Sequence, residues 1–204
     1  MKLITLTGAG GIGKDSILKE LLNRNSKLNN LVSNTSRPMR KGEKDGIDYN
    51  FKTFEEMNNL LKANGLLESR VYTVASGEEW IYGIPIDSLD WNSDNIYITI
   101  VDVDGFKQIK KVFKDKCRSN DLISFYIDGS YQTRYTRYFN RATTKKMSDE
   151  EFMEFIQEAH RRFLDDNVNV VVFKDKFDHI ISNDDRPLNN TVNEILGVLK
   201  TYGI

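Results

Sequence analysis

The chain has 204 residues, the size of one α/β domain with elaborations. It carries 29 Lys and Arg against 30 Asp and Glu, which argues against bulk nucleic-acid binding because that needs a large positive excess. Cys117 is the single cysteine, which excludes an intrachain disulfide and favours a reducing, cytoplasmic compartment. No apolar stretch approaches the length of a membrane span, so we expect no membrane partner.

The stretch Lys2–Leu22 has the order strand, glycine-rich turn, helix, which is the context of a phosphate-binding loop. Successive backbone N–H groups can face a phosphate there, and a helix beginning near Gly13 adds the positive end of its dipole. Lys14 supplies a mobile charge for the β- and γ-phosphates. The N-terminal run therefore predicts a first strand rather than a signal peptide. The expected ATP contacts here are Gly8, Ala9, Gly10, Gly11, Ile12, Gly13, Lys14, Asp15 and Ser16.

Asp15 departs from the usual pattern GxxxxGK[ST], in which a hydroxyl at this position contacts Mg²⁺. A carboxylate is also a good ligand for Mg²⁺, so the sequence predicts that metal binding survives. Ser16 cannot simply take over, since one step along a helix turns a side chain by about 100°.

Beyond Asn23–Asn30, which predicts a polar loop, residues 32–51 read VSNTSRPMRKGEKDGIDYNF. Arginines near a tyrosine suit a phosphate, although basic clusters are more often solvated loops. The segment resembles the monophosphate-binding segment of the guanylate kinase family, S-x-T-T-R-x-x-R-x-G-E-x-x-G-x-D-Y-x-F. The resemblance implies the following substrate contacts: Ser33 at the base, and Arg37, Arg40 and Tyr49 at the phosphate.

A short helix is expected after Thr53, because Thr53 and Glu56 have the spacing of a capping box. The family resemblance places Glu68 at the Watson–Crick edge of guanine, where a carboxylate accepts from two adjacent donors. It also places Tyr82 at the monophosphate. Ile84, however, stands where many guanylate kinases have Ser or Thr. The run Tyr82-Gly83-Ile84-Pro85, together with the loop Gly13-Lys14-Asp15-Ser16, resembles instead the ribose 1,5-bisphosphate phosphokinases, a related branch.

The β-branched run Asn95–Val103 predicts a buried central strand that ends in two acidic residues. Acidic side chains at the carboxyl end of such a strand lie where ligands bind. The resemblance implies that Asp102 holds a metal-bound water and that Asp104 lies near the guanine amine. Either residue could instead cap the next helix, expected at Phe106–Phe113.

A further strand is expected at Leu122–Ile127, followed by a helix from about Gln132 whose arginines are spaced to line one face. By resemblance, Arg137 and Arg141 close over the transferring phosphate, and a lid follows that includes Lys145 and Lys146. The next helix is expected from Ser148 to about Leu164. The family carries another catalytic arginine early in this helix; a gapless reading puts Ile156 there, with Arg161 and Arg162 further along.

Val168–Phe173 is a continuous apolar run, and Phe177–Asp185 closely resembles the family's final strand with its Asn-Asp-Asp sequence. The resemblance places Asn183 near the adenine of ATP. Residues Leu188–Tyr202 predict a terminal amphipathic helix.

Together these features predict an α/β fold: a P-loop core with a mostly parallel five-stranded sheet. We expect one unit of 204 residues, with the core at 1–32, 86–140 and 149–204, a monophosphate-binding insertion at 33–85 and a lid at 141–148. The expected reaction is ATP-dependent phosphorylation of a nucleoside monophosphate, GMP or dGMP first, with Mg²⁺, in a monomer or homodimer. The alternatives are a ribose 1,5-bisphosphate phosphokinase or other (deoxy)nucleotide kinase, and a non-catalytic guanylate kinase-like interaction domain.

Overall fold

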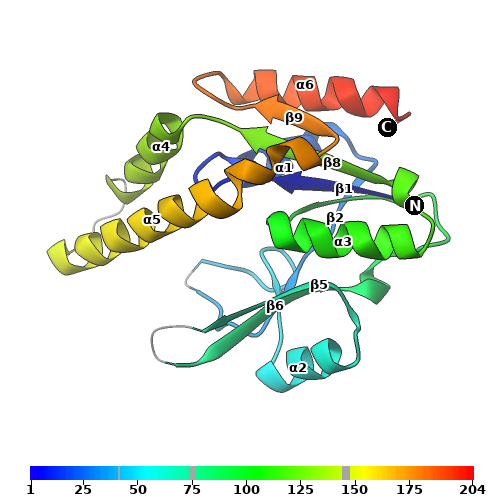
Figure 1. Ribbon diagram of the computed structural model, residues 1–204, viewed down its shortest axis with the longest axis horizontal. Helices are drawn as coiled ribbons and strands as arrows, with labels where there is room; N and C mark the ends of the chain where they lie inside the picture. Colours follow the sequence, from blue (N-terminus) through cyan, green and yellow to red (C-terminus); the bar gives the residue numbers. More distant parts are fainter. Residues whose placement is uncertain (41, 74–76, 144–147) are drawn as a thin grey trace. The chain divides into compact units, whose positions relative to one another are not determined.

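The computed structural model describes residues 1–40, 42–73, 77–143 and 148–204, without the side chains of residues 141, 142, 158, 162, 165 and 167–169. One sheet has five strands in the order β2-β7-β1-β8-β9, and a second has the order β4-β3-β6-β5. Figure 1 labels β1, β2, β8 and β9 of the first sheet and β5 and β6 of the second. The five-stranded sheet is parallel, as its pairs β2–β7 and β8–β9 show, so the predicted α/β class is confirmed. Its strands are β1 (Lys2–Thr7), β2 (Leu28–Asn30), β7 (Ile96–Ile100), β8 (Leu122–Asp128) and β9 (His179–Ser182).

The chain divides into two compact units, each described here by itself. Unit 1 comprises Met1–Ile4, Leu28–Thr99 and Asp104–Leu122, and unit 2 comprises Thr5–Lys27, Ile100–Val103 and Ile123–Ile204. The helices are α1 (Lys14–Arg24), α2 (Phe54–Lys62), α3 (Val103–Asp115), α4 (Tyr131–Thr143), α5 (Asp149–Asn169) and α6 (Leu188–Thr201), with 3-10 turns η1 (Ile86–Ser88), η2 (Ser119–Asp121) and η3 (Val171–Lys176). None of the described helices combines the length and the apolar character that a membrane span needs.

In unit 2, helix α6 packs against α1 and β9 (Figure 1). Its buried side chains Thr191, Val192, Ile195 and Leu199 recur with helical spacing, as the predicted amphipathic helix requires. Ser182 ends β9, and the chain passes directly through Asn183 to this helix. The residues between β9 and α6 are therefore anchored at both ends by packed elements.

Helices α4 and α5 lie side by side in unit 2 (Figure 1). Aromatic rings from the two helices pack against each other. The ring centroids of Tyr138 and Phe155 are 4.7 Å apart, and those of Tyr131 and Phe163 are 5.1 Å apart. Helix α5 starts after Ser148, close to the predicted start, and Ser148 caps it, but the helix continues to Asn169 rather than ending near Leu164. The apolar run 168–173 thus ends this helix and enters η3.

Unit 1 contains the four-stranded sheet, with β3 (Asn34–Thr35), β4 (Asn50–Phe51), β5 (Leu66–Thr73) and β6 (Glu79–Pro85). Helix α2 packs against the β5–β6 pair and buries Met57 completely (Figure 1). The predicted capping box of α2 is confirmed: the Thr53 hydroxyl accepts from the Glu56 N–H at 3.2 Å, and the Glu56 carboxylate accepts from the Thr53 N–H at 2.7 Å.

Several further predicted boundaries are wrong. The expected loop Asn23–Asn30 includes strand β2, whose Leu28 is buried while its two asparagines are exposed, so the strand carries almost no hydrophobic signal. Helix α3 begins at Val103 rather than at Phe106, and β7 ends at Ile100. Asp104 therefore lies in the first turn of α3, where a carboxylate is stabilised by the helix dipole.

Candidate active site

The phosphate loop of unit 2 connects β1 to α1 through residues 8–13. Gly13 precedes the helix with φ 97°, a left-handed conformation that glycine adopts without strain. At Gly8 a Cβ atom would lie 2.4 Å from the carbonyl oxygen of Ile127, so only glycine fits against β8. No side chain caps the start of α1, which leaves its first N–H groups to face a ligand.

Lys14 folds back over this loop. Its Nζ atom donates to the carbonyl oxygens of Gly8 at 2.7 Å and Ala9 at 3.1 Å. The ammonium group is thereby held above the loop by backbone oxygens, where a phosphate oxygen would be its stronger partner.

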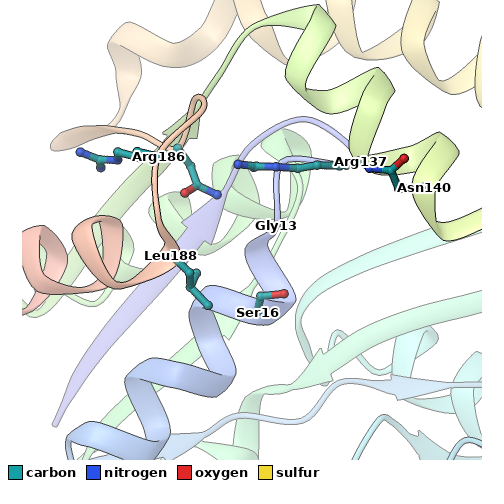
Figure 2. A pocket seen from close by; sticks show the side chains of 8 residues that line it. Gly13, Ser16, Arg137, Asn140, Arg186 and Leu188 are labelled. Atoms are coloured by element: carbon teal, nitrogen blue, oxygen red, sulfur yellow. The ribbon is translucent and has the colours of Figure 1, made fainter.

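A cavity of about 340 Å³ opens beside the loop within unit 2. Figure 2 shows Arg137 extending from α4 over the loop that carries Gly13, with Ser16 on α1 below it. Arg137 donates to the carbonyl oxygen of Ile12 at 3.0 Å. Two arginines and several polar groups give the cavity the character of an anion site; its lining is Gly11, Gly13, Ser16, Arg137, Asn140, Asn183, Arg186 and Leu188.

Asn183 is buried between the loop and α6, with 3% of its surface exposed. Its amide nitrogen donates to the carbonyl oxygen of Ile12 at 2.7 Å, and its amide oxygen accepts from the Thr191 hydroxyl at 2.6 Å. Asn183 therefore connects the floor of the cavity to α6 and holds the phosphate loop in place.

A buried ion pair supports the loop from its other side. Arg134 donates through Nε to the carbonyl oxygen of Gly10 at 3.0 Å and through Nη2 to the carboxylate of Asp166 at 2.6 Å. The same carboxylate oxygen accepts from the Gly10 N–H at 2.7 Å. The guanidinium also lies over the ring of Phe163, 4.8 Å from its centroid. Helix α5 thus binds the phosphate loop directly.

Asp184 fixes the start of α4. It accepts from the Ser130 N–H at 3.0 Å, from the Ser130 hydroxyl at 2.8 Å and from the Thr133 hydroxyl. The hydrogen bonds from Thr133 and then Ser130 lower the pKa of Asp184, so the carboxylate stays ionised there. This contact positions the helix that carries Arg134 and Arg137.

Unit 1 contains a second polar cluster, centred on the buried Arg37. Its Nε donates to the Tyr82 hydroxyl at 3.1 Å, and its two terminal nitrogens donate to the Glu43 carboxylate at 2.9 and 2.8 Å. Its guanidinium carbon lies 5.2 Å from the centroid of the Tyr49 ring. The hydrogen bond with Glu43 raises the pKa of Arg37, and Arg37, followed by the Arg40 backbone, lowers the pKa of Glu43 to about 2.

Glu68 lies on β5 with 7% of its surface exposed. Burial raises the pKa of its carboxyl group, opposed by the charge of Arg70 and by the backbone N–H of Ile84. Asp104 accepts from Lys107 at 2.9 Å and from Arg70 at 3.3 Å. The hydrogen bond from Lys107 lowers the pKa of Asp104, with the charge of Arg70 acting in the same direction.

The guanylate kinase family profile matches residues 1–201. The chain belongs to the guanylate kinase family. The guanylate kinase of Prochlorococcus marinus subsp. pastoris is 30% identical over 202 residues, covering 98% of this chain and 97% of that protein. The guanylate kinase of Oceanobacillus iheyensis is 27% identical and covers 98% of this chain and 86% of its own. A crystal structure of guanylate kinase from Anaplasma phagocytophilum shares the fold, with a TM-score of 0.68 at 20% identity. The match covers 98% of this chain and 85% of that chain.

In this member of the guanylate kinase family, the residues predicted for ATP and for the monophosphate each gather within one unit. Lys14, Ser16, Arg137 and Asn183 belong to unit 2, and the acceptor-site predictions all belong to unit 1. Ser33 is half-buried and its carbonyl oxygen accepts from the Asn50 N–H at 2.9 Å. The Arg40 side chain is exposed, and its backbone N–H donates to Glu43 at 2.7 Å.

Several of the residues predicted for the lid of this guanylate kinase family member lie, in whole or in their side chains, outside the residues that the structure describes. Arg141 belongs to α4, but its side chain lies outside the described residues, as does that of Arg162. Lys145 and Lys146 lie outside the described residues entirely. Ile156 and Arg161 both lie on α5.

The two predicted metal ligands of this guanylate kinase family member, Asp15 and Asp102, are both exposed residues of unit 2. Within the described ranges, no three His, Cys, Asp or Glu side chains gather into a group that could hold a metal ion. In kinases Mg²⁺ is usually held by one or two carboxylates together with nucleotide phosphates, and carboxylates such as Asp15 and Asp102 are of the type that could serve.

The structure of this guanylate kinase family member also assigns contacts that the sequence did not predict. Asp166 and Arg186 reach the phosphate loop and the cavity from positions distant in the chain. Arg70 forms an ion pair with Asp104, and its charge also acts on Glu68. Glu43 is the one unpredicted contact residue whose role the sequence could have indicated, because it stands within the motif that contains Arg37 and Arg40.

Proposed function

We propose that this chain catalyses the transfer of the γ-phosphoryl group of ATP to the phosphate of GMP or dGMP. An oxygen of the acceptor phosphate bonds to the γ-phosphorus, and the bond to the β–γ bridging oxygen breaks, which gives ADP and GDP or dGDP. The arrangement of unit 1 carries the proposal. The buried carboxylate of Glu68 and the hydroxyl of Tyr82, which is bonded to Arg37, stand on the same pair of strands.

In this proposal the base and the phosphate of the acceptor each bind to side chains with complementary hydrogen-bonding groups. Glu68 accepts from the N1–H and the amino group of guanine, and Arg37 with Tyr82 binds the phosphate through donors. Glu43 occupies the Arg37 guanidinium with two hydrogen bonds, so it keeps this buried cation paired and oriented.

The donor nucleotide would bind in unit 2, with its phosphates on the loop N–H groups. Lys14 and Arg137 then stabilise charge on the phosphoryl group, and no covalent intermediate with the protein is needed. Catalysis is positioning together with charge neutralisation. Asp15 and Asp102 offer the hard oxygen ligands that Mg²⁺ prefers, and the ion when bound would neutralise phosphate charge.

The experiment that tests this function is ADP release with ATP–Mg²⁺ against a panel of acceptors. The panel contains GMP, dGMP, AMP, dTMP, CMP, UMP and ribose 1,5-bisphosphate. The highest kcat/KM is expected for GMP or dGMP. Preference for ribose 1,5-bisphosphate or for another base would overturn the proposal and assign the Arg37 cluster to a different acceptor.

The variant Glu68→Gln tests the base contact. We expect kcat/KM for GMP to fall roughly a hundredfold, because an amide cannot accept two hydrogen bonds side by side and its N–H₂ group opposes guanine donors. The affinity for ATP should barely change. An unchanged GMP rate would remove Glu68 from this role.

The same carboxylate predicts a pH dependence. Because burial raises the pKa of Glu68, its protonation begins at a higher pH than that of an exposed glutamate. Protonation removes acceptor capacity, so KM for GMP is expected to rise as the pH falls through this raised pKa. The fall of kcat/KM on the acid side of the pH profile should disappear in Glu68→Gln. If this fall persisted in the variant, another titrating group would cause it.

The variant Asp15→Ser tests the metal ligand. Serine restores the hydroxyl of the usual phosphate-loop pattern, so we expect activity within about tenfold of the parent chain with Mg²⁺. Titration of ADP release with Mg²⁺ is the measurement, because a changed half-saturating concentration identifies a ligand. Complete loss of activity would show that the carboxylate has a specific task that a hydroxyl cannot perform.

A further inference from the structure

The ring of Tyr82 in unit 1 packs against two other tyrosine rings. Tyr72 on β5 is opposite Trp80, and Tyr82 lies two residues further along β6, so the two tyrosines are diagonal neighbours on one face of the strand pair. The ring centroids of Tyr72 and Tyr82 are 5.5 Å apart with an interplanar angle of 88°. Those of Tyr49 and Tyr82 are 5.8 Å apart at 71°. Both contacts have the edge-to-face geometry that aromatic pairs prefer.

The hydroxyl group of Tyr82 is bonded to Arg37. The Arg37 side chain is 3% exposed, and its terminal nitrogens donate to the Glu43 carboxylate at 2.9 and 2.8 Å and to the Pro38 carbonyl oxygen at 2.8 Å. Its Nε atom donates to the Tyr82 hydroxyl at 3.1 Å. Because the hydroxyl accepts there, its own proton points away from the guanidinium and is available to a ligand. The orientation of the Tyr82 side chain therefore decides where this donor is presented.

Tyr72 is the more loosely held of the two tyrosines that contact Tyr82. Tyr49 is also linked to Arg37, whose guanidinium carbon lies 5.2 Å from the Tyr49 ring centroid. Tyr72 lies near the end of β5, and 49% of its surface is exposed. A half-exposed side chain contributes less to the stability of the fold than a buried one, so we expect its replacement to act mainly on the neighbouring ring.

We propose that Tyr72 is a positioning residue for the phosphate of the acceptor nucleotide and that it acts through Tyr82. This inference rests on the proposed function, in which Tyr82 binds that phosphate, and it adds a residue to the site. The ring of Tyr72 restricts the rotamers of Tyr82, so the hydroxyl is aimed before the acceptor binds and less conformational freedom is lost on binding. The contact is made by the ring, so the Tyr72 hydroxyl has no part in this role.

The test compares the parent chain with Tyr72→Ala and Tyr72→Phe in the binding of GMP and of guanosine, measured by calorimetry. Guanosine lacks the phosphate, so the dissociation constant of guanosine divided by that of GMP reports the phosphate contact separately from the base contact. In Tyr72→Ala this ratio is expected to fall roughly tenfold, and KM for GMP to rise by a similar factor while KM for ATP stays within about twofold. Tyr72→Phe keeps the ring and should retain the parent ratio.

A double-mutant cycle with Tyr82→Phe tests whether the effect passes through the Tyr82 hydroxyl. Without that hydroxyl there is no donor to aim, so adding Tyr72→Ala should change the ratio by less than about twofold. Val71→Ala is the matched control, because Val71 is 47% exposed on the same strand and its side chain lies on the opposite face. It should leave the ratio and KM for GMP unchanged. Thermal unfolding establishes that each variant is folded before the ratios are compared.

An unchanged ratio in Tyr72→Ala would overturn the inference. Equal losses in Tyr72→Ala and Tyr72→Phe would overturn it as well, because they would assign the effect to the Tyr72 hydroxyl. An equal loss with and without the Tyr82 hydroxyl would show that Tyr72 does not act through Tyr82. A parent chain that binds GMP no more tightly than guanosine, or that phosphorylates another acceptor, would refute the proposed function before any variant is compared, so the two failures are distinguishable.

Discussion

Replacing Lys14 with alanine is expected to lower kcat for phosphoryl transfer by roughly 10³-fold. The ammonium group is held over the phosphate loop by the carbonyl oxygens of Gly8 and Ala9, so its charge is already in place when a nucleotide binds. Removing a preorganised charge of this kind costs transition-state stabilisation rather than ground-state binding alone. The measurement is single-turnover ADP formation with saturating ATP–Mg²⁺ and GMP.

Lys19→Ala is the matched control for this prediction. Lys19 is exposed on the same helix, so its removal changes the net charge equally without touching the loop. Thermal unfolding of both variants checks that the loop has not collapsed. If Lys14→Ala kept the parent rate, the predicted catalytic role of Lys14 and the phosphate loop would be contradicted. If the parent chain itself had no transferase activity, the alternative of a non-catalytic interaction domain would hold.

Asp166→Ala is expected to lower the free energy of unfolding by about 3 kcal/mol. The substitution leaves the Arg134 guanidinium, whose side chain is 2% exposed, without its carboxylate, and it also removes the acceptor of the Gly10 N–H. For a chain of this length the loss corresponds to a fall in Tm of about 6 to 12 °C. Urea and thermal unfolding measure it.

Two further variants separate charge from packing at this site. Arg134→Met in the Asp166→Ala background should recover part of the lost stability, because it removes the unpaired cation and keeps an apolar side chain against Phe163. Glu154→Ala, an exposed acidic residue on the same helix, should change the stability by less than about 0.5 kcal/mol. Equal destabilisation by Asp166→Ala and Glu154→Ala would contradict a special role for the Asp166 carboxylate.

The sequence predicted best those features whose causes lie close together in the chain. The glycines of the phosphate loop, the start of α1 at Lys14 and the capping box of Thr53 and Glu56 depend on neighbouring residues, and the structure has each of them. The wrong boundaries occur where tertiary pairing decides. Strand β2 exists because Leu28, Asn29 and Asn30 pair with β7, which no local pattern of a polar segment indicates.

The contacts that could not be predicted from the sequence join residues that lie far apart in the chain. Asp166 reaches Gly10 across 156 positions of the chain, and Arg70 reaches Asp104 across 34. In the sequence, an aspartate near the end of a helix or an arginine in a strand has the composition of an ordinary solvated surface. Only the fold brings these side chains to the phosphate loop and to the Glu68 carboxylate.

The distribution of tryptophan gives this chain a built-in optical reporter. Both tryptophans, Trp80 and Trp91, belong to unit 1. Trp80 is two residues from Tyr82 on β6, and Trp91 packs against Phe113 with its indole N–H donating to the carbonyl oxygen of Ile86. Unit 2 has no tryptophan, so selectively excited tryptophan emission reports on unit 1, which contains the proposed acceptor site, without a label.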